Sequence, residues 1–414
     1  MKKDLDELMA WDQVDAIWVT GALFNNPDMV YFTGVRHVTQ ADLFRLRGKP
    51  PVLFYFSDME RDEAAQSGLE AHAYDERRPL DVMLNQSHGD LVAALATRIS
   101  ETLRDLGVSS GRVAVSGRVA FDTMHALLEN IKARLPDVDF ITYFRDSLIQ
   151  KARMTKEEIE AENIREIGQL TTRVVARTAE YLTTRPVRGQ QLLDETAQPL
   201  TVWKVKQRIR IWLAEMGADN PEETIFSIGR DAGIPHSAGN PQDIITLGQP
   251  IVFDIFPCQG GGGYFYDITR TWCLGYAPDE VSRLYHQVMQ VYQAVTEQLR
   301  PNALFKDYQD LACQLFTELG HTTIQQDYST AEGYIHSLGH GIGLNVHENP
   351  FSGISSSPND RLLPGVVFTI EPGLYYPSRG MGVRIEDTIY LNQQGQFEVL
   401  APYPFDLVLP MKND

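Results

Sequence analysis

Two acidic residues lie at mirrored positions around a glycine-rich segment. Asp254 interrupts an apolar run, and Asp267 stands in a second β-rich run beyond the glycine-rich segment 257–263. Glycine clusters between two strand-like runs are typical of a hairpin. A turn centred on Gly260 and Gly261 would place the two carboxylates opposite each other.

The same arrangement recurs near the C-terminus. Glu371 ends an apolar run, and Glu386 ends the run that returns after the turn-forming segment 377–380. A turn centred on Ser378 and Arg379 places these two carboxylates opposite each other. The two ascending runs also resemble each other in sequence, with their acids offset by two residues, which keeps the acids on the same strand face. We therefore predict an internal duplication in which two hairpins face one site.

Opposed carboxylates within apolar strands need compensation. Two carboxylates roughly 4 Å apart repel by about 4 kcal/mol at an effective dielectric constant near 20. Protonation is one remedy, and divalent cations bridged by carboxylate oxygens are the other. The alternative is that the strand registers slip and the acids face water. Two pairs with matched symmetry favour the metal site.

Three histidines fall within the short segment 334–350. His336 and His340 have the spacing of a helical zinc pair, but the intervening glycines disfavour a helix and the glutamate of an HExxH motif is missing. A strand or loop is expected instead. Imidazole beside carboxylates suits Mn, Co, Fe or Zn better than Ca. A phosphate loop is disfavoured because the lysine of a P-loop is absent, and His236, in a Gly/Pro-rich loop, is by itself more typical of a structural histidine.

The elements that must position these residues form two groups. The first 150 residues alternate between strand-like and helical stretches, which indicates an α/β layer. The expected strands are 14–20, 29–33, 51–56, 112–116 and 139–144, and the expected helices are 90–107 and 119–134.

A boundary is expected near residue 150, which divides the chain into domains 1–150 and 151–414. Thr155 and Glu158 have the spacing of a capping box that opens a long helix. The helices expected after it run to about 182, from 190 to 216, from 278 to 299 and from 305 to 319. Because β-rich hairpins lie between and after these helices, the second domain is predicted to be α+β.

Composition narrows the functional classes. The 414 residues carry 37 Lys and Arg against 55 Asp and Glu, a formal charge of −18, which makes nucleic acid a poor partner. No apolar stretch approaches the roughly 18 residues of a membrane span, and the start of the chain lacks the apolar core of a signal peptide. The three cysteines form no CxxC pair, which suits a reducing compartment. A cytoplasmic protein without a membrane partner is expected.

Taken together, these motifs resemble the pita-bread metallopeptidases: aminopeptidase P, prolidase, methionine aminopeptidase and the related creatinase. The resemblance covers most of 151–405 and rests on four strings: Asp-Ile-Thr-Arg-Thr, Gly-His-Gly-Ile-Gly, Thr-Ile-Glu-Pro-Gly and Val-Arg-Ile-Glu-Asp. The segment 26–34 is similar to an early signature of the creatinase/prolidase N-terminal domain. Methionine aminopeptidases generally lack that domain, and creatinase has lost metal ligands that this chain retains.

The resemblance implies a pita-bread catalytic domain with internal pseudo-twofold symmetry and a metal site of five ligands. Asp254 would chelate one metal ion, Asp267 and Glu386 would bridge, and His340 and Glu371 would hold the second. A metal-bridged water or hydroxide would act as the nucleophile.

The resemblance also implies catalytic roles for His236, His336, His347 and Arg384. The three histidines would line the substrate pocket, with His347 donating to the oxyanion and His236 contacting the substrate near the scissile bond. Arg384 would be a carboxylate partner beside the last ligand. Phe256 departs from the family pattern, which usually has glycine two residues after the first Asp, and the first hairpin is longer by about two residues.

The predicted function is hydrolysis of the bond before proline in short peptides, as in aminopeptidase P or Xaa-Pro dipeptidase. The resemblance implies two divalent ions per chain, with Mn favoured over Co or Zn, and a homodimer. One alternative is a hydrolase or lyase of the same fold that acts on a non-peptide small molecule. Another is a non-catalytic binding protein, although such relatives usually lose metal ligands.

Overall fold

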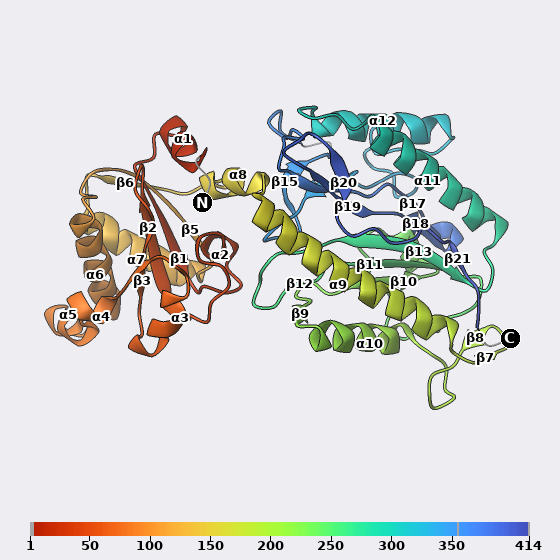
Figure 1. The fold of residues 1–414 in the computed structure, drawn as a ribbon, viewed down its shortest axis with the longest axis horizontal. Coiled ribbons are helices and arrows are strands. Elements are labelled where there is room, and N and C mark those ends of the chain that lie inside the picture. Colours follow the sequence, from red (N-terminus) through yellow and green to blue (C-terminus); the bar gives the residue numbers. More distant parts are fainter. Residues whose placement is uncertain (1–3, 354–355, 413–414) are drawn as a thin grey trace. The chain divides into compact units, whose positions relative to one another are not determined.

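The computed structural model describes residues 4–353 and 356–412, and it divides into two compact units. The first unit runs to Arg153 and includes Gly261–Gly263, whereas the second takes Met154–Gly260 and the chain from Tyr264 onward. Figure 1 labels the elements of both.

The first unit is built on a mixed six-stranded sheet in the order β4-β3-β2-β1-β5-β6. Its strands are β1 (Ala16–Gly21), β2 (Ala41–Leu46), β3 (Val52–Tyr55), β4 (Glu70–Ala73), β5 (Gly111–Gly117) and β6 (Val138–Ile141). The helices are α1 (Asp4–Trp11), α2 (Pro27–Thr33), α3 (Arg61–Ala65), α4 (Tyr74–Arg77), α5 (Leu80–Gln86), α6 (Leu91–Asp105), α7 (Phe121–Arg134) and α8 (Leu148–Met154). The expected α/β layer is therefore present, with β2 and β4 as strands that the sequence analysis did not identify.

One predicted strand of this unit is a helix. Residues 29–33 were expected to be extended, but they belong to α2. Asn26 holds the N-cap position in extended conformation, a proline opens the helix, and Gly34 ends it with a positive φ of 65°. Proline at the first position and glycine just past the end favour a helix, and these signals outweigh the β propensity of the residues between them.

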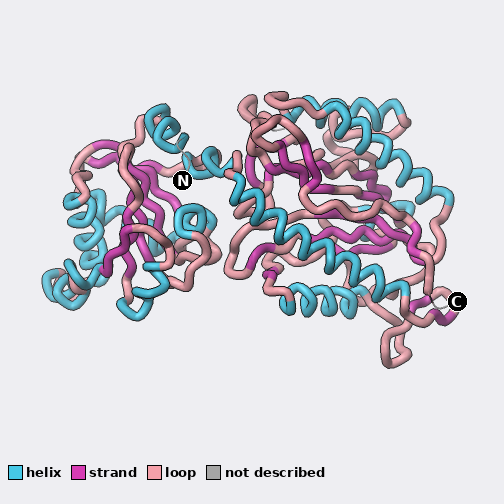
Figure 2. Tube along the Cα trace, in the orientation of Figure 1, coloured by secondary structure: helices cyan, strands magenta, loops and turns pink. Residues whose placement is uncertain are grey.

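The second unit has two similar halves, each with a helix pair and a sheet (Figures 1 and 2). The helices are α9 (Glu158–Thr183) and α10 (Val202–Glu215) in the first half, and α11 (Asp279–Gln298) and α12 (Phe305–Glu318) in the second. The first sheet has the order β10-β11-β13-β21 and the second β15-β14-β16-β19-β20. Each helix pair buries its apolar face in a separate hydrophobic core against its own sheet.

The remaining bounds complete the second unit. Its strands are β7 (Val187–Arg188), β8 (Gln191–Leu192), β9 (Ala218–Asp219), β10 (Ile225–Ile228), β11 (Pro250–Ile255), β12 (Cys258–Gln259), β13 (Ile268–Leu274), β14 (His340–Gly341), β15 (Glu348–Phe351), β16 (Val367–Ile370), β17 (Gly373–Tyr376), β18 (Met381–Arg384), β19 (Asp387–Leu391), β20 (Phe397–Val399) and β21 (Val408–Leu409). Single 3₁₀ turns lie at Asp58–Glu60, Asp231–Gly233 and Pro377–Arg379.

Two helix starts differ from the prediction. The capping box is formed by Glu157 and Glu160, because Thr155 pairs with Val366 in a β-bridge. The next helix begins at Val202, twelve residues later than expected. The expected start near residue 190 is wrong because the preceding residues form β8 and a turn rather than helix.

The first acidic hairpin is shifted from its predicted register. Asp254 pairs with Thr269 rather than with Asp267. The turn is centred one residue later than expected because Gly261 and Gly262 take the positive φ values, +80° and +78°. The partner of Asp254 moves by two positions along the opposite strand, so Asp267 remains a diagonal neighbour on the same face.

The second acidic hairpin follows the predicted register. Strands β16 and β19 end on the pair Ile370 and Asp387, and β17 and β18 continue in the same register beyond it. Glu371 and Glu386 therefore lie opposite each other, and the turn at Pro377–Arg379 is where it was expected. This register prediction is confirmed.

No helix within residues 4–353 and 356–412 is long and apolar enough to cross a membrane.

Candidate metal centre and substrate pocket

The five predicted metal ligands converge from both sheets of the second unit. Asp254 lies in β11 and Asp267 directly precedes β13, whereas His340 opens β14 and the two glutamates follow β16 and β18. All five side chains are buried. His340 Nε2 lies 3.4 Å from Glu371 Oε1 and 3.8 Å from Asp267 Oδ2. Ligand atoms of Asp267, His340 and Glu386 all lie within 4.8 Å of one another.

The glycines around His340 allow the backbones to approach closely. A Cβ on Gly339 would lie 2.0 Å from Thr369 O, and one on Gly341 would lie 2.2 Å from Asn349 O. Because a side chain at either position would clash with a neighbouring strand, glycine is needed at both, in keeping with the predicted strand or loop with close backbone packing. That packing brings His340 to the carboxylates.

The carboxylates of the site are buried close together and repel one another. Burial in the first place, and then the neighbouring carboxylates, raise the pKa values of Asp267 and Glu371 well above their ordinary range. Burial, followed by the charge of Asp254, raises the pKa of Glu386 to about 8. Each shift records a preference for losing negative charge, which proton uptake or a bound cation would satisfy.

The site also has free acceptor atoms. Within the described residues, the buried Oδ1 atoms of Asp254 and Asp267 and the buried Oε1 atom of Glu386 have no hydrogen-bond partner. Buried polar oxygens are normally satisfied, so these atoms point to a ligand. Four carboxylates and one imidazole form a donor set suited to divalent transition metals. The residues therefore fit the metal ions that the sequence analysis predicted.

His340 is arranged to offer a lone pair to a metal ion. Burial, followed by the repulsion that a protonated His347 would exert, lowers the pKa of His340 well below the usual value, so the ring is neutral at neutral pH. Its Nδ1 atom lies 3.0 Å from Gly341 O. If Nδ1 carries the proton and donates to this carbonyl, the Nε2 lone pair faces Glu371 and Asp267.

Arg384 is buried beside the first ligand. Its Nη2 group forms a short ion pair with Asp254, and Nη1 donates to Pro235 O and to the Tyr375 hydroxyl, each at 3.0 Å. The nearby negative charges outweigh desolvation and raise the pKa of Arg384 well above its usual value. The residue predicted as a carboxylate partner therefore contacts the carboxylate of Asp254.

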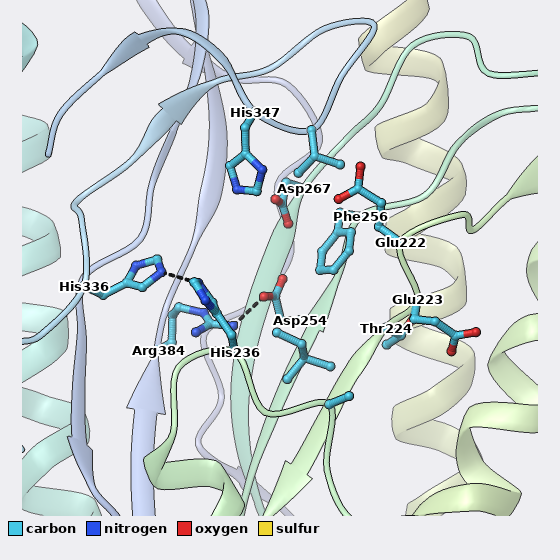
Figure 3. A pocket seen from close by; sticks show the side chains of 13 residues that line it. Glu222, Glu223, Thr224, His236, Asp254, Phe256, Asp267, His336, His347 and Arg384 are labelled. Carbon is cyan, nitrogen blue, oxygen red and sulfur yellow. Dashed lines mark hydrogen bonds and ion pairs between the residues drawn. The ribbon is translucent and has the colours of Figure 1, made fainter. Parts of the chain in front are cut away.

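The remaining predicted histidines line a cavity of about 220 Å³ beside the carboxylates (Figure 3). His236 Nε2 and His336 Nε2 lie 2.9 Å apart. The ring of His347 is tilted by 58° against that of His340, with centroids 4.2 Å apart, and His347 is exposed to solvent. Desolvation lowers the pKa values of His236 and His347. It lowers the pKa of His336 to about 3. All three rings are therefore neutral near pH 7.

Thr269 is a supporting residue that the sequence analysis did not identify. Its hydroxyl donates to Glu386 Oε2 at 2.7 Å and accepts from Arg384 Nε at 3.1 Å. The signal was available, because Thr269 lies two residues after Asp267 and so shares its strand face.

Lys156 and Glu348 form a second supporting contact that was not identified. Lys156 Nζ lies 3.0 Å from Glu348 Oε2, and the two side chains are only 1% and 6% exposed. Glu348 also accepts a hydrogen bond from the Asn345 N–H at 3.0 Å. The pair thereby fixes the turn that carries His347. No sequence spacing could reveal it, because 192 residues separate the partners.

Lys156→Met is therefore expected to destabilise the chain by about 2 kcal/mol, because it leaves the Glu348 carboxylate buried without its cation. Urea unfolding measures the loss. The double variant Lys156→Met/Glu348→Gln should recover part of it, since no charge is then left unpaired. A double variant as unstable as the sum of the two single variants would contradict the proposed coupling.

Comparison with known proteins identifies the family. The model of the creatinase/prolidase N-terminal domain matches residues 2–155, and the model of metallopeptidase family M24 matches residues 162–393. The chain is 31% identical to a probable dipeptidase PepE of Mycobacterium tuberculosis over 256 residues, which are 61% of this chain and 60% of the relative. It is 29% identical to an Xaa-Pro dipeptidase of Pyrococcus furiosus over 272 residues, 66% of this chain and 69% of that protein.

Similarity to solved structures extends along the whole chain. An Xaa-Pro dipeptidase from Bacillus anthracis superposes with a TM-score of 0.74 at 21% identity and covers 98% of each chain. The expected α+β fold, with a creatinase/prolidase N-terminal domain followed by a pita-bread domain, is thereby confirmed. With its matches to both domain models, the chain belongs to metallopeptidase family M24.

Proposed function

We propose that this chain hydrolyses the peptide bond before proline in short peptides, as an aminopeptidase P or an Xaa-Pro dipeptidase. The observation that carries the proposal is the convergence of Asp254, Asp267, His340, Glu371 and Glu386, with unsatisfied buried oxygens, beside a histidine-lined cavity. The similarity to Xaa-Pro dipeptidases supports the substrate class.

These five residues would hold two divalent ions, with Mn suited to a carboxylate-rich set that includes one imidazole. Such ions supply a water nucleophile of lowered pKa and polarise a carbonyl oxygen. Two ions would carry four positive charges, which matches the four carboxylates that otherwise repel one another.

The side chains of the cavity would bind and orient the peptide. His347, a neutral imidazole, would donate a hydrogen bond to the carbonyl oxygen as negative charge develops on it. His236 would contact the substrate near the scissile bond, and its contact with His336 would orient its ring. Arg384 would hold the Asp254 carboxylate in place through their ion pair. The cytoplasmic location and the homodimer remain predictions.

The proposal predicts a strict requirement for proline. After loading with Mn, the chain should cleave Ala-Pro or Ala-Pro-Ala and leave the matched Ala-Ala and Ala-Ala-Ala peptides uncut. Chromatographic detection of released products measures both, and the two peptide lengths separate a dipeptidase from an aminopeptidase. Equal cleavage with and without proline, or cleavage restricted to N-terminal methionine, would refute the Xaa-Pro assignment.

A further inference from the structure

One wall of the cavity carries a carboxylate that the proposed chemistry does not use. Glu222 lines the cavity together with Phe256 and Val346, and its side chain is exposed. Figure 3 shows Glu222 beside Phe256, away from Arg384. Glu222 and His347 line the same cavity, so this carboxylate faces the space that would receive the peptide.

Glu222 differs from Asp254 and Glu223, the two acids of the cavity that form ion pairs with an arginine. Arg384 pairs with Asp254, and the adjacent Glu223 pairs with Arg210 and lies 3.9 Å from Lys206. Within the described ranges, 4–353 and 356–412, the Glu222 side chain forms no ion pair and no hydrogen bond. Its charge therefore remains available to a bound molecule.

The surroundings of Glu222 suit a cation on an apolar stem. Phe256 offers an aromatic ring, and Val346 and Ile225 add aliphatic surface. Lysine and arginine side chains lie along such surfaces with their charged ends at a carboxylate, and an aromatic face also attracts a cation. Because the wall is part of the cavity that would receive the peptide, the cation would belong to the substrate.

We propose that Glu222 binds a cationic nitrogen of the residue that precedes the scissile bond and so favours positively charged substrates. The nitrogen has two possible sources, the side chain of Lys or Arg and the free α-ammonium group. This inference rests on the proposed peptide hydrolysis, and it names the chemistry that the cavity selects.

Paired substrates separate the two sources. Lys-Pro-Ala and norleucine-Pro-Ala share an aliphatic stem and differ in the terminal ammonium group, whereas Ala-Pro-Ala and N-formyl-Ala-Pro-Ala differ in the α-ammonium group. For an exposed carboxylate, kcat/KM should favour the cationic member of the relevant pair by about fivefold. The preference should shrink as salt is raised.

Glu222→Gln removes the charge and keeps the shape of the side chain. It should bring the ratio of kcat/KM values within the affected substrate pair close to one, and Glu222→Asp should restore part of the preference. Glu223→Gln makes the same change one residue away, at a carboxylate already paired with Arg210, and it should leave both ratios as they are. If Glu222→Gln abolishes the preference for Lys-Pro-Ala over norleucine-Pro-Ala, Glu222 binds the side-chain cation of the substrate. If it abolishes the preference for the free amine over the N-formyl peptide, Glu222 binds the α-ammonium group.

The experiments distinguish a failure of the role of Glu222 from a failure of the proposed function. An active enzyme whose two ratios are unchanged by Glu222→Gln overturns the role of Glu222 and leaves the proposed function standing. A metal-loaded chain that cleaves no Xaa-Pro peptide counts against the proposed function. In that case, calorimetric binding of Lys-Pro-Ala and norleucine-Pro-Ala still tests Glu222, because equal affinities in the wild-type chain overturn its role without any turnover.

Discussion

Asp267→Asn is expected to lose bound metal and peptide hydrolysis together. Asp267 lies within ligand distance of both His340 and Glu386, at the centre of the buried carboxylates. Asparagine has the same shape but is neutral and offers one oxygen, so it cannot bridge two cations. With fewer bound cations, the negative charges of the other three carboxylates would no longer be balanced.

Elemental analysis after Mn loading measures this result directly. The wild-type chain should contain about two ions, as a two-metal site requires, and the variant should contain few or none. Asp42→Asn is a matched control, because Asp42 is a buried carboxylate of the first unit that accepts hydrogen bonds from Trp18 and Tyr74. It should keep the full metal content. An Asp267→Asn chain with circular dichroism like that of the wild type and an unchanged metal content would refute the bridging role.

His347→Ala is expected to keep the metal ions and to lose turnover. The ring of His347 contacts that of His340 and lines the cavity. Glu348 fixes the turn that carries His347 by accepting a hydrogen bond from the Asn345 N–H. A donor to the developing oxyanion acts mainly in the transition state, so its loss should lower kcat by about 10²–10³ with a smaller change in KM.

The measurement combines metal content with steady-state kinetics on an Xaa-Pro peptide. His286→Ala serves as a control, because His286 lies on the surface of α11, outside the cavity, and should leave kcat unchanged. A His347→Ala chain that loses its metal would make His347 a ligand rather than a donor. Unchanged turnover would remove it from the mechanism altogether.

The two acidic hairpins differ in how closely their sequences specify the position of the turn. In the second hairpin, Pro377 and Gly380 bracket a tight turn, so the midpoint of the pattern was also the midpoint of the structure. In the first hairpin, four successive glycines allow several turn centres. The chain uses Gly261 and Gly262, which shifts the partner of Asp254 to Thr269.

The shift nevertheless left Asp267 on the predicted strand face, because side chains alternate along a strand. A displacement of two positions returns Asp267 to the face it was expected to occupy, whereas a displacement of one would have turned it away. For α2, the β propensity of the residues led to a wrong prediction, because the proline at the start and the glycine at the end of the segment favour a helix.

By itself, the sequence determined the residue types, their order and their strand faces. The matched acids and the glycine-flanked His340 predicted a metal-binding chemistry, because these types and spacings constrain local geometry. Only the tertiary structure decided which distant residues complete the site. The contact of Lys156 with Glu348 and the place of Glu222 on the wall of the cavity depend on how the elements of the second unit pack. Such contacts join positions far apart in the chain, and no local period encodes them.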